Sequence, residues 1–564
     1  MRISQIQKDL KQALGASLKA IAYENPPDKP LDYPDIEIEI PKNEKHGDLS
    51  TNIAMRLARQ LQTSGVKLAG LVKEKIVTYI GSGLLREVIS KVEVYPPGFV
   101  NFHFSKSYLD SVMTLVQKDG RDFGRGRDGC GQRVDLEFVS ANPTGPLTIA
   151  HGRQAAVGDA IARILEFSGY RVTREYLIND MGTQIDILAK SIQSRYLSIN
   201  GIDVPFPSDG YQGEYIKDIA RELNNTFGKR FISQDPGDLK VIAGFGVEFM
   251  LRGIRSDLDK FGVHFDKWFS QSALSREKVE AVLKDLRSNG FIYEKDGATW
   301  FRSSVFGDDK DRVVIKKDGA LTYLAPDIAY HLDKYKRGFD KIVDIWGPDH
   351  HGYISRLKAS IQALGYDKAS ISVLIVQLAT LYRSGEVISM STRKGEFITL
   401  SEVVGEVGRD VAKFFFLMRK LDSHLDFDLE VAKKSSLDNP VYYIQYAHAR
   451  IASILKFSDN MEKRLAEIKY DPGLIGQPEE LLILRMICQF PLAVQASAKL
   501  LEPYRMVEYL SELAKIFHSF YTKHRVVLED DLPSTKARLT LVRCVKAVLA
   551  NGLGLLGISL PDRM

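Results

Sequence analysis

Hydrophobic positions recur along the chain with two different periods, and their succession predicts a parallel α/β core. Residues 134–138 alternate as a strand does, and the apolar stripe that follows has helical spacing and ends at Gly169. A second strand, polar turn and helix begin at residues 341–347 and lead to a further strand at 371–381. Alternating strands and helices are typical of a doubly wound parallel sheet, so we expect a Rossmann-like domain.

Other patterns occur on either side of this predicted sheet. The N-terminal part combines an amphipathic helix over residues 3–18, a half-buried strand at 36–40, a helix at 49–61 and a strand–turn–strand segment at 92–104. Later in the chain strand patterns disappear, and helical patterns fill residues 440–456, 478–500, 503–525 and 535–552. We therefore predict an α+β unit before the sheet and an all-α bundle after it.

These patterns divide the chain into five parts. An N-terminal domain of residues 1–106 precedes a linker at 107–131, whose end is rich in Gly, Arg and Asp. The α/β domain then covers residues 132–404 and carries an insertion at about 190–260. A connecting segment at 405–437 leads to a helical domain at 438–564. A chain of 564 residues is too long for one core, which agrees with several domains.

Composition narrows the class of protein. Hydrophobic residues make up 44% and charged residues 26%, the proportions of a soluble globular protein. The three cysteines form no close pair, so we expect neither a disulfide framework nor a thiolate zinc site, and a reducing cytoplasm fits. No apolar run reaches membrane-spanning length, and the N-terminus lacks a signal-peptide core. A net charge of +5 neither requires nor excludes RNA binding.

His151 and Gly152 stand at the first turn of the predicted helix after the strand at 134–138. A helix N-terminus presents free N–H groups and a partial positive charge, which suit a phosphate. In an open parallel sheet, ligands bind at such strand-to-helix turns. An ordinary turn with one surface histidine is the alternative.

The longer string SANPTGPLTIAHGR (residues 140–153) resembles the HIGH signature of class I aminoacyl-tRNA synthetases, and its context from Glu137 onward is similar to the arginyl-tRNA synthetases. KHGDLSTNIA and PPGFVNF, at 45–54 and 96–102, resemble that family's N-terminal additional domain, which touches the tRNA elbow. DNPVYYIQYAHARI and the chain end resemble its anticodon-binding domain. The resemblance implies an ATP-dependent arginine–tRNA ligase that forms arginyl-adenylate, transfers arginine to tRNA(Arg) and releases AMP and pyrophosphate.

Both nucleotide signatures depart from the family pattern. The resemblance places Thr148, Ala150, His151 and Gly152 in a signature that usually reads His-x-Gly-His, so Thr148 replaces its first histidine. The segment MSTRKGEF resembles the KMSKS loop that binds the leaving pyrophosphate, and its candidate catalytic residues are Met390, Ser391, Thr392, Arg393 and Lys394. A solvated basic turn is the alternative for this loop. A small-molecule nucleotidyltransferase, or an impaired paralogue that binds tRNA or arginine, is the alternative for the chain.

A pocket for arginine needs carboxylates, because they pair bidentately with a guanidinium group. The resemblance implies that Tyr323 and Asp327 hold this group and that Glu137 adds a second negative charge. It also implies that Ser140 and Asn142 hold the amino and carboxylate groups of the substrate, beside His151. A helix N-cap is the alternative for Asp327, and a solvent-exposed strand end is the alternative for Glu137.

The remaining predictions concern ATP, tRNA and the state of the protein. The resemblance assigns a ribose or adenine contact to Asp349, His350 and His351, for which metal binding is the alternative. Tyr442, Tyr446 and Arg450 are expected to contact tRNA, with bundle core as the alternative. ATP is a substrate and implies Mg²⁺, whereas no protein-bound structural metal is expected. We expect a cytoplasmic monomer without membrane contact.

Overall fold

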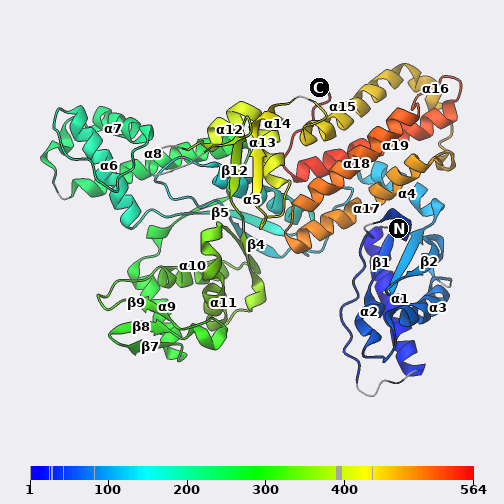
Figure 1. Ribbon diagram of the computed structural model, residues 1–564, viewed down its shortest axis with the longest axis horizontal. Helices are drawn as coiled ribbons and strands as arrows, with labels where there is room; N and C mark the ends of the chain where they lie inside the picture. Colours follow the sequence, from blue (N-terminus) through cyan, green and yellow to red (C-terminus); the bar gives the residue numbers. More distant parts are fainter. Residues whose placement is uncertain are drawn as a thin grey trace.

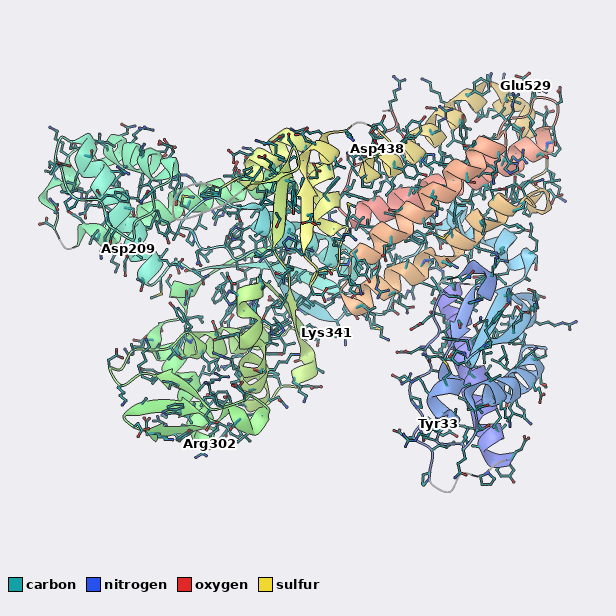
Figure 2. All side chains as sticks on the ribbon, viewed as in Figure 1. Tyr33, Asp209, Arg302, Lys341, Asp438 and Glu529 are labelled. Carbon is teal, nitrogen blue, oxygen red and sulfur yellow. The ribbon has the colours of Figure 1, made fainter. Side chains whose placement is uncertain are left out.

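The computed structural model describes residues 2–24, 26, 30–41, 43–81, 83–235, 237–388, 397–434 and 436–563. Figure 1 shows a central α/β domain, a helical insertion at one end, a green lobe below the sheet, and a helical bundle and an N-terminal domain at the other end. Side chains fill each of these parts, and Figure 2 marks Asp209 in the insertion, Arg302 in the lobe and Glu529 at the far end of the bundle. This arrangement confirms the predicted multidomain α/β class.

The central sheet is parallel throughout, in the order β11-β10-β4-β5-β6. Its strands are β4 (Arg133–Glu137), β5 (Arg171–Ile178), β6 (Lys267–Ser270), β10 (Lys341–Trp346) and β11 (Ile371–Ile375). The chain runs outward from β4 to β6, returns to β10 beside β4, and continues to β11. The strand order therefore reverses between β4 and β10, as the doubly wound prediction requires.

The alternation along β4 explains how two helices cover its two sides. Helix α5 (Ile149–Phe167) packs on the apolar side, where the ring of Phe138 lies 2.2 Å from the place that a Cβ on Gly158 would occupy. Glycine is required there, because any side chain would push the helix off the strand. Asp135 and Glu137 point to the opposite side, toward α10 (Leu324–Lys336).

Two segments interrupt the succession of parallel strands: an insertion between β5 and β6, within the first half of the sheet, and a lobe that begins after β6. The predicted insertion is helical, with α6 (Thr183–Ile199), α7 (Glu214–Phe227) and α8 (Asp238–Phe261). The green lobe contains α9 (Arg276–Ser288), α10, α11 (Ile354–Ala363) and an antiparallel sheet of β7 (Ile292–Lys295), β8 (Ala298–Phe301) and β9 (Arg312–Ile315). β9 pairs with β8 and not with the parallel sheet.

The predicted strand at 371–381 is two strands in two sheets. β11 ends at Ile375, and β12 (Ala379–Arg383) joins β13 (Glu386–Val387) and β14 (Leu425–Asp428). Helices α12 (Leu400–Val407), α13 (Arg409–Leu417) and α14 (Leu429–Lys433) accompany this second sheet. The apolar run is continuous because both strands are partly buried, so periodicity alone does not reveal the break.

The N-terminal domain contains α1 (Ile3–Glu24), α2 (Ile53–Ala58), α3 (Gly65–Gly81) and a sheet in the order β1-β3-β2, made of Leu49–Thr51, Phe99–Phe104 and Ile89–Tyr95. Two predictions fail here. Residues 36–40, predicted as a strand, form an isolated bridge from Glu39 to Ser50 and no continuous ladder. The helix predicted from Leu49 begins at Ile53, since residues 49–51 pair with β3 instead.

The C-terminal bundle consists of α15 (Pro440–Ser458), α16 (Glu462–Ala466), α17 (Pro478–Leu500), α18 (Tyr504–Lys523) and α19 (Leu532–Leu555). The predicted linker contains α4 (Lys106–Asp119), which packs on α17 and α19. Among the described helices, α17 is long and apolar enough to span a membrane, contrary to the sequence expectation. It packs against α18 and α19, and 56% of its apolar window is buried within the protein.

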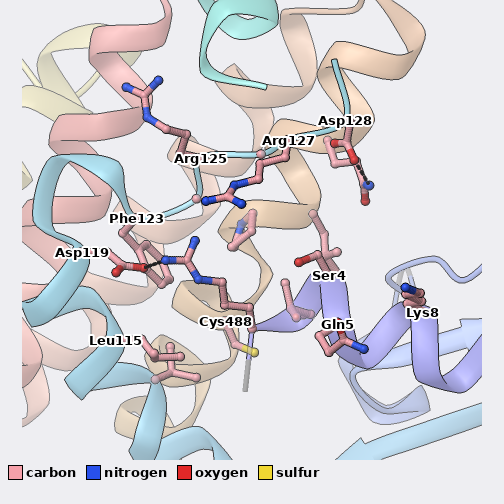
Figure 3. A pocket seen from close by; sticks show the side chains of 18 of the residues that line it. Ser4, Gln5, Lys8, Leu115, Asp119, Phe123, Arg125, Arg127, Asp128 and Cys488 are labelled. Carbon is pink, nitrogen blue, oxygen red and sulfur yellow. Dashed lines mark hydrogen bonds and ion pairs between the residues drawn. The ribbon is translucent and has the colours of Figure 1, made fainter. Parts of the chain in front are cut away.

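A cavity of about 830 Å³ lies where the start of α1, the loop after α4 and α17 meet (Figure 3). Several contacts cross this junction. Among them, Arg2 pairs with Asp119 at 3.0 Å, the Gln495 amide donates to Asp128 at 3.3 Å, and the rings of Phe123 and Phe490 stack. No residue of the parallel sheet lines the cavity. It therefore joins domains and is separate from the ends of the parallel strands.

Candidate functional site

The carboxyl ends of β4 and β10 diverge at the reversal of strand order, where open α/β sheets bind ligands. The chain turns sharply as it leaves β4, because Val139 and Ser140 have φ values of 67° and 37°. Such left-handed conformations are strained for residues other than glycine and concentrate at functional sites. The predicted site residues from Glu137 to Gly152 lie on either side of this turn and within it.

His151 is held by the N-cap of its own helix. The N–H of Thr148 donates to His151 Nδ1 at 3.1 Å, and the Thr148 hydroxyl lies 3.1 Å from the same nitrogen. Because Nδ1 accepts, the ring carries its hydrogen on Nε2. Burial lowers the pKa of His151 to about 4, so the ring is neutral near pH 7. The variant residue Thr148 thus orients the histidine, which offers a neutral N–H donor.

The residues just after the second nucleotide signature return to the same helix start. Thr399 forms an antiparallel bridge with Thr148, and the N–H of Leu400 donates to the Leu147 carbonyl at 2.8 Å. Leu400 also lies 2.6 Å from the place of a Cβ on Gly152, which gives that glycine a packing role. The predicted residues Met390, Ser391, Thr392, Arg393 and Lys394 lie outside the described residues.

Arg153 is a residue that sequence reasoning missed. Its buried guanidinium donates to the carbonyls of Gln377, Lys420 and Ser423 at 2.7, 2.9 and 2.9 Å, and burial lowers its pKa to about 10. These bonds fix the start of α5 to the loops around β12 and β14. A signal exists in the sequence, because a cation on an apolar helical stripe needs internal partners.

Glu137 is buried at 6% exposure, which excludes the alternative of a solvent-exposed strand end. Its Oε1 accepts from the Ser140 hydroxyl at 3.0 Å, and its Oε2 accepts from the Tyr330 hydroxyl at 2.9 Å and Lys334 Nζ at 2.7 Å. The Ser140 hydroxyl in turn accepts the N–H of Leu177 at 3.1 Å. The carboxylate therefore has a fixed orientation before any ligand binds.

The predicted guanidinium ligands begin helix α10. Tyr323 occupies the N-cap position and is 82% exposed, so Asp327 is not the N-cap. The Asp327 carboxylate instead accepts from the Tyr353 hydroxyl at 2.5 Å, and burial raises its pKa. Tyr353 is the last residue of the short helix after β10 that carries the predicted ATP residues. Its hydrogen bond to Asp327 therefore connects the predicted arginine and ATP residues.

A row of carboxylates crosses the sheet beneath α10. Asp344, Glu137 and Glu175 occupy matching positions on β10, β4 and β5, so their side chains share one face. Fully buried Lys334 lies 2.9 Å from Asp344, 2.7 Å from Glu137 and 3.1 Å from Asp135. Arg337 pairs with Glu175 at 2.6 Å. Sequence reasoning identified only Glu137, although acidic residues that alternate with apolar ones in a buried strand require cations opposite them.

The other predicted substrate contacts lie around the same crevice. Asn142 donates to Gln184 and accepts from Asn179, both at 2.8 Å. The exposed residues Asp349, His350 and His351 belong to the short helix Pro348–Tyr353 after β10. Within the described ranges, no group of three or more His, Cys, Asp or Glu side chains is arranged to hold a metal ion.

The predicted tRNA contacts lie on α15. Tyr442 and Tyr446 are half-buried and parallel, with ring centres 6.2 Å apart. The Arg450 guanidinium lies 4.5 Å from the ring centre of Tyr521 and donates to its hydroxyl. Arg450 and Tyr521 line a cavity of about 590 Å³ with Phe457, Lys523, His524 and Arg525. Tyr442 and Tyr446 do not line this cavity, which combines the exposed ring of Phe457 with cations, a combination that suits single-stranded RNA.

Comparison with known proteins assigns each part of the chain to a family. Residues 4–104 match the arginyl tRNA synthetase N-terminal domain, residues 114–205 and 247–423 match the class I (R) tRNA synthetase catalytic domain, and residues 444–564 match the DALR anticodon binding domain. The interval between the two catalytic matches falls on α7 and the start of α8.

Full-length relatives agree with these assignments. The chain is 44% identical to an arginine–tRNA ligase of Desulforamulus reducens, over 100% of this chain and 99% of the relative. It is 43% identical to the Bacillus subtilis arginine–tRNA ligase, over 99% and 100% of the two chains. The fold is similar to that of Thermus thermophilus arginyl-tRNA synthetase, with a TM-score of 0.76, 20% identity, and coverage of 99% of this chain and 100% of that one.

Proposed function

The chain belongs to the arginyl-tRNA synthetase family and is an arginine–tRNA ligase, and from this premise we propose that the crevice between β4 and β10 holds its substrates. The enzyme activates arginine with ATP to arginyl-adenylate and transfers the arginine to tRNA(Arg). The observation that carries our placement is the convergence of Glu137, Asp327 and His151 on the loops and helix starts at this crevice.

Arginine binds with its guanidinium toward Asp327 and Glu137 in this proposal. The Tyr353 hydroxyl donates a hydrogen bond to one oxygen of the Asp327 carboxylate and fixes the orientation of that group. The carboxylate therefore needs less rearrangement when arginine binds. Tyr323, exposed at the same helix start, covers the guanidinium. Ser140 and Asn142, on the loop after β4, face the amino and carboxylate groups of the substrate.

Replacing Asp327 by asparagine tests the arginine site. We expect the KM for arginine to rise by at least about 30-fold, because loss of one charged partner from a buried pair typically costs about 2–5 kcal/mol. The KM for ATP should change less than about threefold. The matched control is Asp318→Asn at an exposed turn. An unchanged arginine KM in Asp327→Asn would contradict the placement.

ATP binds with its phosphates at the start of α5 in our proposal. The neutral Nε2–H of His151 and the free N–H groups of this helix end donate to the phosphate oxygens. Mg²⁺ enters bound to the ATP phosphates, and Asp349, His350 and His351 lie beside the ribose or adenine. The segment 389–396, adjoining the Thr148–Thr399 bridge in sequence, supplies the pyrophosphate contacts.

The bundle binds tRNA on α15 and the end of α18 in this proposal. Tyr442, Tyr446 and the 59% exposed Phe457 offer stacking surfaces, whereas Arg450 and Arg525 face phosphates. We further propose that the enzyme is a monomer and that it acts in the cytoplasm, where aminoacylated tRNA is used.

Replacing Arg525 by glutamine tests this RNA surface. Loss of one phosphate contact should raise the KM for tRNA by roughly three- to tenfold and reduce the slope of log affinity against log salt by about 0.7–0.9. The KM for arginine should not change. Lys515→Gln, an exposed cation of α18 outside the cavity, is the control. Equal salt slopes for Arg525→Gln and the control would place the RNA elsewhere.

A further inference from the structure

His331, one turn beyond Asp327 on α10, has hydrogen-bond acceptors at both ring nitrogens. Nδ1 lies 2.8 Å from the Asp327 backbone carbonyl, and Nε2 lies 2.9 Å from Asp344 Oδ2. A carbonyl oxygen only accepts, and so does a carboxylate that already accepts from Lys334 on its other oxygen at 2.9 Å. Both nitrogens therefore carry hydrogen, and the buried ring is an imidazolium.

The charges around His331 explain why a proton stays there. Four buried carboxylates lie on the strands opposite α10, namely Asp344 of β10, Asp135 and Glu137 of β4, and Glu175 of β5. Among the residues that the structure describes, two permanent cations face them, Lys334 of α10 and Arg337 at its C-cap. Asp327 adds a further carboxylate at the mouth of the site. The neutral hydroxyls of Tyr330 and Tyr353 supply hydrogen bonds to this group and no charge.

We propose that His331 stores a proton that partly neutralises the empty arginine site and that arginine competes with this proton when it binds. The proposal rests on the placement of the guanidinium between Asp327 and Glu137. A guanidinium there interacts with the carboxylates that stabilise the imidazolium, so each cation weakens the binding of the other. By linkage the effect is reciprocal, and arginine binding releases protons.

The direction of the pH dependence follows from this competition. Burial by itself lowers the pKa of His331, but Asp344 outweighs it, and the net pKa lies above the usual value of 6.5. The proton is therefore present below about pH 6.5 and lost as the pH rises through the raised pKa. Arginine affinity should rise over the same range. The KM for arginine should fall by roughly three- to tenfold, the effect expected when one of two like charges several ångströms apart is removed.

His331→Gln separates the charge from the hydrogen bond. A glutamine amide reaches the position of Nε2 and still donates to Asp344, but it holds no titratable proton. We would measure the KM for arginine from pH 6 to 9 at saturating ATP and tRNA. The wild-type KM should fall with rising pH, and His331→Gln should show a smaller fall; the remainder comes from Asp135, whose pKa burial raises to about 7. His264→Gln, which removes an exposed histidine 3.0 Å from Asp259, should keep the wild-type profile.

Two further measurements separate the possible failures. Equal pH profiles for His331→Gln and wild type overturn the proton linkage, whereas an unchanged arginine KM in Asp327→Asn overturns the placement of the substrate. If His331→Gln does not fold, calorimetry on the wild-type enzyme decides. Arginine is titrated near pH 7 in buffers of different ionisation enthalpy. Heats that depend on the buffer, with net proton release, support the proposal, and buffer-independent heats overturn it.

Discussion

Replacing His151 by alanine should lower kcat for arginine-dependent ATP–pyrophosphate exchange by about 10²–10³-fold, the usual effect of removing one preorganised donor to a developing oxyanion. The donor is Nε2–H, because Thr148 occupies Nδ1 and burial keeps the ring neutral. The loss should appear in kcat with little change in the KM for arginine. Exchange is measured with and without tRNA(Arg).

His151→Asn is the matched variant for this experiment. The asparagine oxygen takes the position of Nδ1 and accepts the Thr148 N–H, so the cap is retained while the Nε2–H donor is lost. Both variants should show a similar loss. Because the pKa of His151 is about 4, neither variant should change the shape of the pH profile between pH 6 and 8.5. Normal exchange in His151→Asn would show that the donor is not used.

Replacing Lys334 by methionine should destabilise the catalytic domain by about 3–5 kcal/mol, because it leaves several carboxylates without their shared cation. Lys334 is fully buried, and Asp135, Asp344 and Glu137 raise its pKa well above 10.5 although burial opposes this, so it remains charged across the usable pH range. All three tryptophans, Trp268, Trp300 and Trp346, belong to this domain, so their fluorescence in urea follows its unfolding.

Lys336→Met controls for the loss of a lysine from the same helix. Lys336 is exposed, and its replacement should change the free energy of unfolding by less than about 0.5 kcal/mol. Similar unfolding midpoints for the two variants would show that the carboxylate row tolerates the loss of Lys334. One of the carboxylates would then take up a proton and so remove the uncompensated negative charge. Asp135 is the first candidate for that proton, because burial already raises its pKa to about 7.

The central sheet and the His151 turn could be predicted from local patterns, since strand, turn and helix each leave a period in the sequence. The lobe sheet and the break between β11 and β12 could not, because partner choice between strands is a long-range property. The roles proposed for Asp327 and Tyr323 come only from family resemblance. Lys334 and Arg153 could have been found from their positions on apolar stripes, but their partners come from distant parts of the chain.

The excess of carboxylates beneath α10 has a consequence for the fidelity of translation. A neutral analogue such as citrulline has nearly the shape of arginine, so cavity volume does not distinguish the two. In the proposed placement it brings a urea oxygen and no positive charge to Asp327 and Glu137, so Asp327 gains no cation from the ligand and Glu137 keeps only Lys334. A site that leaves buried polar groups unpaired rejects an analogue by roughly 10⁴-fold or more. We therefore expect arginine to be selected at the binding step, by charge.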